Sequence, residues 1–577
     1  MSSQPTDRRP PTRTRALSPW WPIRAAALLF FLATAAVAAQ AEPRPSNVIF
    51  ILVDDLRYDG MGFLNPKIST PHIDELARGG TYAANTVVTT SLCSPSRATI
   101  LTGLSTRNHG IVDNNDSSED TLTFFPELLQ GAGYQTAFVG KWHMGNATDA
   151  PRPGFDHWVS FRGQGVYTPR NTLAGLPATF NVDGERVRQS GYITDELTNY
   201  AIRWLENRDD HQPFFLYLSH KAVHSDPLPA ERHRGQYDDV DFNLPRSAEE
   251  APPGSAGKPR WVHDQRNTWH GIEFFYNSDL TMSEYLRSYY ATLSAVDDSV
   301  GRLLQFLRSR KLEENTLIVF TSDNGFLIGE HGLIDKRNAY QPSVRVPFVA
   351  YQPGTVPAGR TTEGRIRNLD FAPTFLDLAG VEQPVEYEGR SAWPLLRGAV
   401  ADDDWVEDDF IYEYYWEWTF PMTPGTFSIT RGDLKYIQYH GVYDLEELYD
   451  LGSDPGEMIN VIDDPRYLDQ KIELRRALYA GLEDRSGRNI IPYSQRRALG
   501  SVRRLEGGSS GGDFPAEWYV EPNRLDRLDD MIPDSRAKQR AKERGEAFFP
   551  YPVMGRDPEK RTTMEAEGST DDEADPP

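Results

Sequence analysis

The chain has 577 residues, which is enough for one large domain and a smaller one. Its 39% hydrophobic and 11% aromatic residues exclude a wholly disordered protein. Its 61 Lys and Arg residues against 84 Asp and Glu residues give a formal net charge of −23. Because nucleic-acid phosphates bind basic surfaces, this charge argues against a nucleic-acid partner. An enzyme with an anionic substrate would need its cations concentrated locally.

Residues 1–41 are predicted to be a signal peptide. Several arginines precede an apolar run from Ala25 to Ala39, and residues 39–41 (Ala-Gln-Ala) have the pattern of a signal-peptidase site. We therefore expect export to the periplasm or the exterior after cleavage near Ala41, with no stable membrane insertion. An uncleaved membrane anchor is the alternative, but the apolar run is short for a full span.

Along the chain from Asn47 to about Ala350, short apolar runs alternate with helical stretches, which predicts a mainly parallel sheet covered by helices. The run 48–53 is apolar throughout, as expected for a central strand buried on both faces. Further strands are predicted at 136–139, 214–218, 317–321 and 346–350.

An amphipathic helix is predicted before the strand at 317, because apolar residues recur there at three- and four-residue steps. These are Leu286, Tyr290, Leu293, Val296, Val300, Leu303 and Leu307. Asp297 and Asp298 lie on the same stretch and are expected on its solvated face.

The domain organisation follows from composition. We expect a catalytic domain over 46–400 and a smaller C-terminal α+β subdomain over 401–499, with strands near 410–414 and 434–439. The polar segment from about 232 to 282 is either an insertion that shapes a binding mouth or a plain surface excursion. An extension follows over 500–577, and its last part is polar enough to be disordered.

Polar clusters follow the predicted strands, where ligands bind in open α/β sheets. Asp54 and Asp55 follow the first strand, and Asp323 and Asn324 follow the strand at 317–321. Three carboxylates and an amide at one edge would repel without a cation, and their hard oxygens suit Ca²⁺ or Mg²⁺ better than zinc. Each pair alone also fits a helix cap or a turn, but the two together favour a metal site.

Cys93 is the only cysteine, so an exported chain has no internal disulfide. A lone thiol in an oxidising compartment is a liability unless it is buried or chemically used. Ser94 followed by Pro95 predicts a helix start, which would place Cys93 where backbone N–H groups and the helix dipole favour anions. Arg97 can point back toward the same spot. An ordinary buried core cysteine is the alternative, but the neighbours are not apolar.

Cations follow other strand ends. Residues 140–143 (Gly-Lys-Trp-His) follow one strand, residues 220–224 (His-Lys-Ala-Val-His) follow another, and Lys336 comes after the metal motif. Each alone is more often a surface cation. Their shared placement predicts a site that holds a tetrahedral anion between a divalent ion, Lys, His and Arg.

Taken together, the motifs around Cys93 and at the strand ends match a known family. Residues 93–97 (Cys-Ser-Pro-Ser-Arg) fit the Cys-x-Pro-x-Arg signature, and the chain resembles the formylglycine-dependent (type I) sulfatases of the alkaline-phosphatase superfamily. The other motifs follow in the family's order, as does 448–451 (Leu-Tyr-Asp-Leu) in the C-terminal subdomain. The resemblance runs from about Asn47 to Asn460. It implies an alkaline-phosphatase-like α/β fold and hydrolysis of a sulfate ester.

The resemblance also implies the site. A separate formylglycine-generating enzyme would oxidise Cys93, and Ca²⁺, with Mg²⁺ possible, would bind there. The implied metal ligands are Asp54, Asp55, Cys93, Asp323 and Asn324, and the implied catalytic residues are Cys93, Arg97, Lys141, His143, His224 and Lys336. Lys336 and His224 resemble the family's candidates for the acid that protonates the leaving alcohol. His224 is preferred to His220 because it precedes a Pro-containing turn.

Two loop motifs indicate the class of substrate. Residues 108–110 (Asn-His-Gly) and 161–165 (Phe-Arg-Gly-Gln-Gly) resemble the N-acetylglucosamine-6-sulfatase-like branch. We therefore expect a sulfated glycan or sugar, with an aryl or other alkyl sulfate as the next candidate. A phosphonate monoester or phosphodiester hydrolase of the same superfamily remains an alternative. So does a non-catalytic glycan-binding protein, although a mere binder needs no nucleophile.

Overall fold

The computed structural model describes residues 46–482, except 115–120, 146–147, 170–177, 244, 246, 248–256, 260, 263–280, 406–408, 418–419, 421–422 and 441. The predicted signal peptide, the predicted extension and part of the 232–282 segment lie outside the described residues. Within them, every helix is too short or too polar to cross a membrane.

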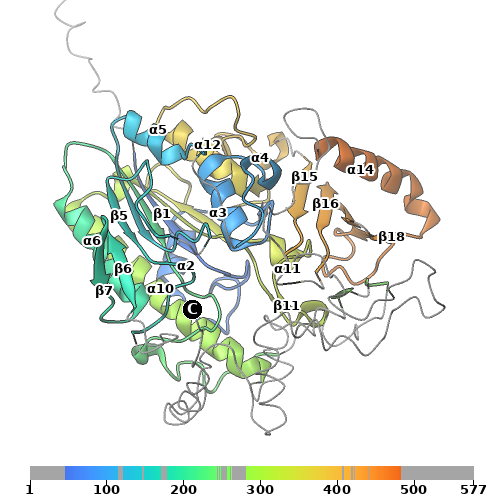
Figure 1. Ribbon diagram of the computed structural model, residues 1–577, viewed down its shortest axis with the longest axis horizontal. Helices are drawn as coiled ribbons and strands as arrows, with labels where there is room; N and C mark the ends of the chain where they lie inside the picture. The colour runs from blue at the N-terminus through green and yellow to red at the C-terminus, as the bar shows by residue number, and fades with distance from the viewer. Residues whose placement is uncertain are drawn as a thin grey trace, which may run out of the picture. The chain divides into compact units, whose positions relative to one another are not determined.

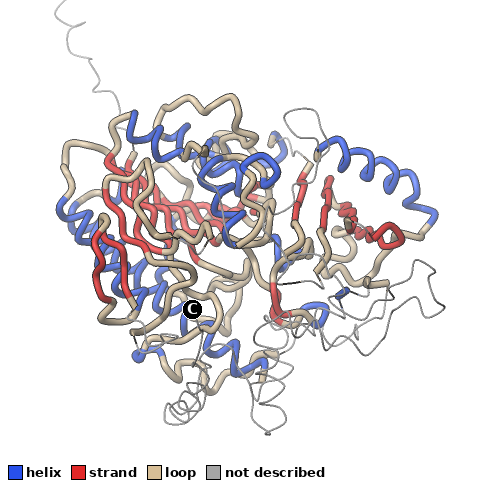
Figure 2. Tube along the Cα trace, in the orientation of Figure 1, coloured by secondary structure: helices blue, strands red, loops and turns tan. Residues whose placement is uncertain are grey.

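Ten strands of the described residues form one large sheet (Figures 1 and 2). In sheet order they are β13 (Arg360–Thr362), β2 (Thr81–Ala83), β12 (Phe348–Tyr351), β9 (Thr316–Ser322), β1 (Asn47–Val53), β8 (Phe214–Ser219), β4 (Gln135–Gly140), β5 (His157–Ser160), β6 (Thr179–Val182) and β7 (Glu185–Arg188). From β9 to β5 all neighbours run parallel. The predicted mainly parallel sheet is confirmed.

The predicted strands match closely, with one shift. The strand expected at 346–350 begins at Phe348, and it runs antiparallel to β9. Pro347 lies just before it and has no N–H to donate to a ladder, which explains the later start. Two short pairs complete the domain, β3 (Thr86–Val87) with β14 (Ile366–Arg367) and β10 (Leu327–Ile328) with β11 (Ile334–Asp335).

The sheet is buried on both faces. Alternate residues of β1 enter two different cores, with Phe50 in one and Ile51 in the other, as strand periodicity requires. Helices cover both faces (Figure 1). One side carries α3 (Cys93–Thr102), α4 (Thr106–His109), α5 (Phe125–Gly131), α12 (Phe371–Leu378) and α13 (Trp393–Leu396); the other carries α2 (Pro71–Gly79), α6 (Ile193–Asn207) and α10 (Met282–Arg310).

The predicted amphipathic helix is α10, and one expectation about it is wrong. Asp297 is buried, and its carboxylate accepts hydrogen bonds from the backbone N–H groups of His72 (3.0 Å) and Ile73 (2.8 Å). These N–H groups lie in the first turn of α2, where no intrahelical acceptor exists. Asp297 therefore caps a neighbouring helix. Asp298 is partly exposed and pairs with Arg232 at 2.6 Å.

The C-terminal subdomain contains an antiparallel sheet in the order β15 (Phe410–Tyr414), β16 (Thr426–Arg431), β17 (Leu434–Tyr439) and β18 (Val442–Asp450). Helix α14 (Leu468–Gly481) packs on it through Leu474 and Leu478, which share a core with Ile429. The short helix α11 (Gln341–Val344) follows β11 along the chain.

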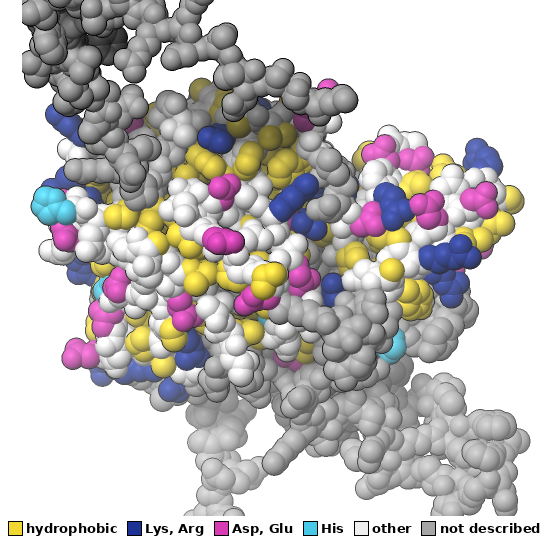
Figure 3. Space-filling model, turned by 90° about the horizontal axis from the view of Figure 1, so that it is seen from above, with side chains coloured by type: hydrophobic (Ala, Val, Ile, Leu, Met, Phe, Trp, Pro, Cys, Tyr) yellow, Lys and Arg dark blue, Asp and Glu magenta, His cyan; other side chains and the backbone are white. Residues whose placement is uncertain are grey.

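On the face drawn in Figure 3, acidic and basic side chains are interspersed. The local concentration of cations lies inside the molecule, at the carboxyl ends of the central parallel strands.

Candidate active site

Cys93 lies at the N-terminus of α3. The helix begins at Cys93 itself, two positions earlier than a start with Pro95 as the first helical residue predicts. The Ser94 hydroxyl does not cap this helix, because it donates to the carbonyl oxygen of His143, while the Ser94 N–H donates to Asn114 Oδ1 at 2.9 Å. Burial raises the pKa of the Cys93 thiol to about 12. An unmodified thiol here is protonated and is a poor nucleophile.

Three carboxylates meet beside Cys93. Oxygen atoms of Asp54, Asp55 and Asp323 all lie within 4.8 Å of one another, and all three side chains are buried. The backbone N–H of Asp55 donates to Asp323 Oδ1 at 3.2 Å, which ties the ends of β1 and β9 together. Asp55 has a left-handed φ of 60°, a backbone strain that is typical of functional sites.

Each carboxylate has a close cationic partner, and Asp54 also lies 3.8 Å from Arg97 Nη2. Lys141 contacts Asp54, Lys336 contacts Asp55, and Arg97 Nε donates to Asp323 at 2.9 Å. Burial opposes ionisation of Asp54, but Lys141 and the other cations outweigh it and hold the Asp54 pKa well below its usual range. Burial, and then the charge of Asp54, raise the pKa of Asp323 to about 6.

Glycine is required where Lys141 leaves its strand. Gly140 has φ 132°, and a side chain there would place its Cβ 1.8 Å from the carbonyl oxygen of Ser219. The close approach lets β4 and β8 end side by side. Arg97 Nη1 then donates both to the carbonyl oxygen of Lys141 (2.6 Å) and to Ser219 Oγ (2.7 Å).

The donor set fits a divalent cation. Asn324 donates through Nδ2 to Asp55 Oδ1 at 2.6 Å, whereas its Oδ1 is buried and has no hydrogen-bond partner among the described residues. A buried amide oxygen beside three carboxylates is a set of hard ligands that suits Ca²⁺. A divalent ion added to the three ion pairs would give the centre a net positive charge. This would attract an anionic substrate into an acidic protein.

Two candidate proton donors approach residue 93. Lys336 Nζ donates to Cys93 Sγ at 3.0 Å. His224 Nε2 lies 3.8 Å from Asp55 Oδ2, and His224 belongs to a second cluster with Cys93 and Asp54. His224 Nδ1 is 2.8 Å from the carbonyl oxygen of Ser225 and donates to it, which leaves Nε2 as an acceptor in the neutral ring. Burial, and then Lys141, hold the His224 pKa well below its usual range.

His143 is also at the centre, and His220 is not part of either cluster. Burial, and then Lys141, lower the pKa of His143, and its Nε2 lies 3.2 Å from the side-chain nitrogen of Gln164. His220 is buried, and neither of its ring nitrogens has a hydrogen-bond partner among the described residues. The structure thus brings together all ten predicted site residues: Asp54, Asp55, Cys93, Arg97, Lys141, His143, His224, Asp323, Asn324 and Lys336.

Sequence reasoning missed several contacts around this centre. The Ser219 hydroxyl accepts a hydrogen bond from Arg97, and the Gln164 side-chain amide contacts the His143 ring. The Tyr167 hydroxyl donates to the carbonyl oxygen of His224 at 2.7 Å. Lys221 Nζ lies 4.5 Å from the centre of the Tyr167 ring. Three of these residues carry a sequence signal: Ser219 is a polar residue at the end of an apolar strand, and Gln164 and Lys221 belong to the motifs at 161–165 and 220–224.

The Asn-His-Gly motif at 108–110 has a supporting role in the fold. His109 Nδ1 accepts the N–H of Ile111 at 3.0 Å, and His109 Nε2 lies 3.1 Å from Thr99 Oγ1 on α3. Asn108 donates to Glu388 at 2.7 Å. These contacts brace the helix that carries Cys93.

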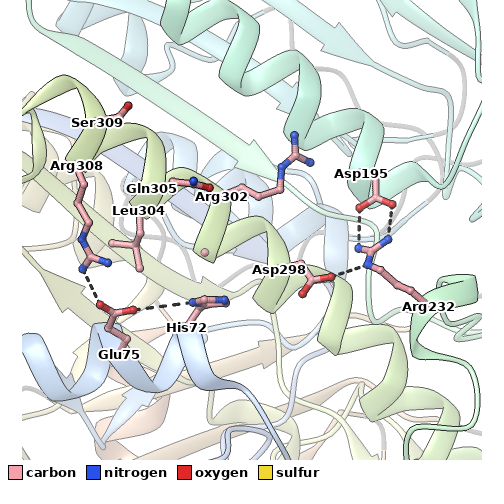
Figure 4. Close-up of a pocket in the computed structure, with 11 residues that line it drawn as sticks. His72, Glu75, Asp195, Arg232, Asp298, Arg302, Leu304, Gln305, Arg308 and Ser309 are labelled. Atoms are coloured by element: carbon pink, nitrogen blue, oxygen red, sulfur yellow. Dashed lines mark hydrogen bonds and ion pairs between the residues drawn. The ribbon is translucent and has the colours of Figure 1, made fainter.

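A groove lies elsewhere, on the face covered by α2, α6 and α10 (Figure 4). Several of its ionisable side chains pair with one another, since Arg232 meets Asp195 at 2.7 Å and Arg308 meets Glu75 at 2.6 Å. None of its lining residues is among the ten site residues.

Comparisons with known proteins identify the family. A sulfatase family model matches residues 46–381, and a model of the N-sulphoglucosamine sulphohydrolase C-terminal region matches 329–484. An N-acetylglucosamine-6-O-sulfatase of Bacteroides thetaiotaomicron is 33% identical over 504 residues, covering 78% of this chain and 88% of the relative. The N-acetylglucosamine-6-sulfatase of Homo sapiens is 29% identical over 470 residues, covering 73% and 82%.

A solved structure, described as a complex with its substrate D-glucosamine-2-N,6-O-disulfate, is similar at a TM-score of 0.68 and 31% identity. The match covers 76% of this chain and 98% of that chain. The large sheet with this centre at its carboxyl edge is the architecture of the alkaline-phosphatase superfamily. Within it, the chain belongs to the sulfatase family and is a sulfuric ester hydrolase. The predicted family and enzyme class are confirmed.

Proposed function

We propose that the chain removes sulfate from a carbohydrate, first of all from 6-sulfated glucosamine units of glycans. The observation that carries this proposal is the set of paired cations and carboxylates around residue 93, with Lys336 Nζ 3.0 Å from Cys93 Sγ. The names of the bacterial and human relatives, and the 6-O-sulfated substrate of the solved complex, support the choice of sugar and position.

The site also supports a metal and a modified residue. Asp54, Asp55, Asp323, Asn324 and residue 93 would hold Ca²⁺, with Mg²⁺ possible, which supplies positive charge for the substrate and lowers the pKa of a bound oxygen. A formylglycine made from Cys93 by a formylglycine-generating enzyme supplies, as its hydrate, one hydroxyl to attack sulfur and another to release sulfate. The raised pKa of the thiol argues against direct attack by cysteine itself.

The remaining catalytic roles, which are positioning and proton transfer, belong to other side chains of the site. Lys141 and Arg97 hold the carboxylates and the sulfate in place, and Asp323 accepts the proton of the attacking group. His143 accepts a proton when sulfate is released.

Lys336 gives a proton to the departing sugar oxygen. Its Nζ already donates toward residue 93, whereas His224 presents Nε2 as an acceptor. This contrast ranks Lys336 above His224 as the acid.

Lys336→Ala should separate good leaving groups from poor ones. We expect a loss of turnover of about 10²- to 10⁴-fold on glucosamine 6-sulfate, whose alkoxide must be protonated, and a much smaller loss on 4-nitrophenyl sulfate. The measurement is kcat for both substrates in parent and variant. Equal losses on both would mean that Lys336 binds sulfate and does not act as the acid.

The reaction class is tested with a matched pair of aryl esters, a sulfate and a phosphate diester, and the substrate with N-acetylglucosamine sulfated at carbon 6 or at carbon 3. We expect higher kcat/KM for the sulfate and for the 6-sulfated sugar, with Cys93→Ala as the inactive control. A faster reaction with the phosphate diester would favour the phosphodiesterase alternative instead.

We also propose that the protein works outside the cytoplasm, after cleavage near Ala41. The basic leader with its apolar run and the Ala-Gln-Ala pattern at 39–41 support this location.

A further inference from the structure

Lys336 lies on a segment with little regular structure of its own. Strand β11 ends at Asp335 and helix α11 begins at Gln341, so residues 336–340 belong to neither. A lysine side chain has several rotatable bonds, and its ammonium is only as well placed as its backbone. The position of Lys336 therefore depends on what holds residues 335–341, here named the Lys336 segment.

The C-terminal subdomain holds one end of this segment through Arg337. Arg337 Nε donates to Glu417 at 2.6 Å, and its guanidinium lies 3.7 Å from the centre of the Phe420 ring. Arg337 Nη1 also pairs with Asp335 at 2.9 Å. All three charged side chains are at most 3% exposed, where an ion pair is screened little by water.

Arg337 also ties the segment to the nucleophile. Its backbone has φ 71°, and its N–H donates to the carbonyl oxygen of Ser91 at 3.1 Å, two residues before Cys93. Rotation about the backbone bonds of Arg337 would therefore move Lys336 relative to residue 93. The pair with Glu417 fixes the side chain of this strained residue, so it opposes that rotation.

A second pair holds the other end. Lys435 Nζ donates to the carbonyl oxygen of Ala339 and to Glu457, both at 2.7 Å. The other oxygen of Glu457 accepts the N–H of Gln341 at 2.7 Å. Lys435 lies on β17, and both charged side chains are at most 1% exposed. The subdomain thus holds the Lys336 segment at two points, through the Arg337–Glu417 ion pair and through the Lys435–Glu457 pair that contacts Ala339 and Gln341.

We propose that Glu417, with Lys435 and Glu457, are positioning residues, through which the C-terminal subdomain keeps Lys336 aimed at residue 93. This inference rests on the proposed function in that Lys336 must take part in the reaction. It does not require that Lys336 be the acid. A displacement of about 1 Å in such a group can cost about 10²-fold in rate.

The test is a double-mutant cycle of Glu417→Gln and Lys336→Ala, with kcat measured on glucosamine 6-sulfate. Glu417→Gln keeps the shape of the side chain and removes its charge. Alone, it should lower kcat about 10- to 100-fold with little change in KM. In the Lys336→Ala background the same substitution should cost less than about 3-fold, because the group that it positions is gone. Equal losses in both backgrounds would overturn the proposal.

Controls separate positioning from folding. Asp409→Asn removes a partly exposed ion pair with Arg431 (2.7 Å) in the same subdomain and should leave kcat unchanged. If Glu417→Gln does not fold, the double substitution Lys435→Met with Glu457→Gln removes both charges of the second pair together, which cores tolerate better. It should show the same dependence on Lys336, and parent-like kcat in this variant would contradict the proposal.

The two proposals fail differently. If Lys336→Ala itself has parent-like kcat on the sugar sulfate, the proposed role of Lys336 is wrong. If Lys336→Ala is strongly impaired and Glu417→Gln is not, only the positioning inference is wrong.

Discussion

Cys93→Ser is expected to release at most one product per enzyme molecule and then to stop. A serine hydroxyl can still attack sulfur, because the carboxylates and cations around residue 93 are unchanged. Its carbon carries a single oxygen, so the sulfate ester that forms has no internal route to elimination. A quenched-flow assay with 4-nitrophenyl sulfate should show this burst, and a mass spectrum should show sulfate on residue 93.

Cys93→Ala provides the matched control, since it removes the nucleophile from the same buried position. It should give neither a burst nor a sulfated peptide. Steady turnover of the serine variant at the parent rate would contradict the need for two hydroxyls on one carbon, and with it the reason for a lone cysteine.

Asp54→Asn is expected to abolish calcium binding and turnover together. Asp54 is one of three carboxylates whose oxygens lie within 4.8 Å of one another, and removing one full negative charge weakens the attraction for a divalent ion. Calorimetric titration with CaCl₂ should show strong binding by the parent and no resolved heat for the variant. An unchanged calcium affinity would mean that the ligands are assigned wrongly.

Asp54 also neutralises Lys141, so the loss could reflect an unpaired buried cation. Asn324→Ala separates the two effects, because it removes the unpartnered amide oxygen without changing any charge. We expect about a 10-fold or greater loss of calcium affinity. The melting temperature in the absence of calcium should also fall, because the substitution removes the Nδ2 hydrogen bonds to Asp55 and to the carbonyl oxygen of Gly325. A parent-like affinity would exclude Asn324 as a ligand.

The sequence predicted the parts of the molecule that depend on local pattern. The run 48–53 became β1, and the polar residues after β1, β4, β8 and β9 met at one edge because parallel strands end together. The positions of Asp54, Lys141 and Asp323 therefore followed from strand ends alone. The parallel sheet brings these motifs, which are far apart in the sequence, together in one site.

Other features depend on tertiary contacts that no local pattern reveals. Asp297 fits the pattern of a solvated helix face, but its carboxylate caps α2. Glu417 lies 80 residues from Arg337 along the chain, and nothing near either residue indicates that they form a buried pair. Gln164 meets His143 because the two residues follow β5 and β4, which the sheet places side by side although the strands are separate in the sequence.

The most direct measurement of the central claim is the mass of the peptide that contains residue 93, from protein made in a host with a formylglycine-generating enzyme. Sulfatase activity should rise in proportion to the fraction of peptide that carries formylglycine in place of cysteine. Protein from a host without that enzyme should contain cysteine and be inactive. Full activity with residue 93 entirely as cysteine would contradict the proposed mechanism.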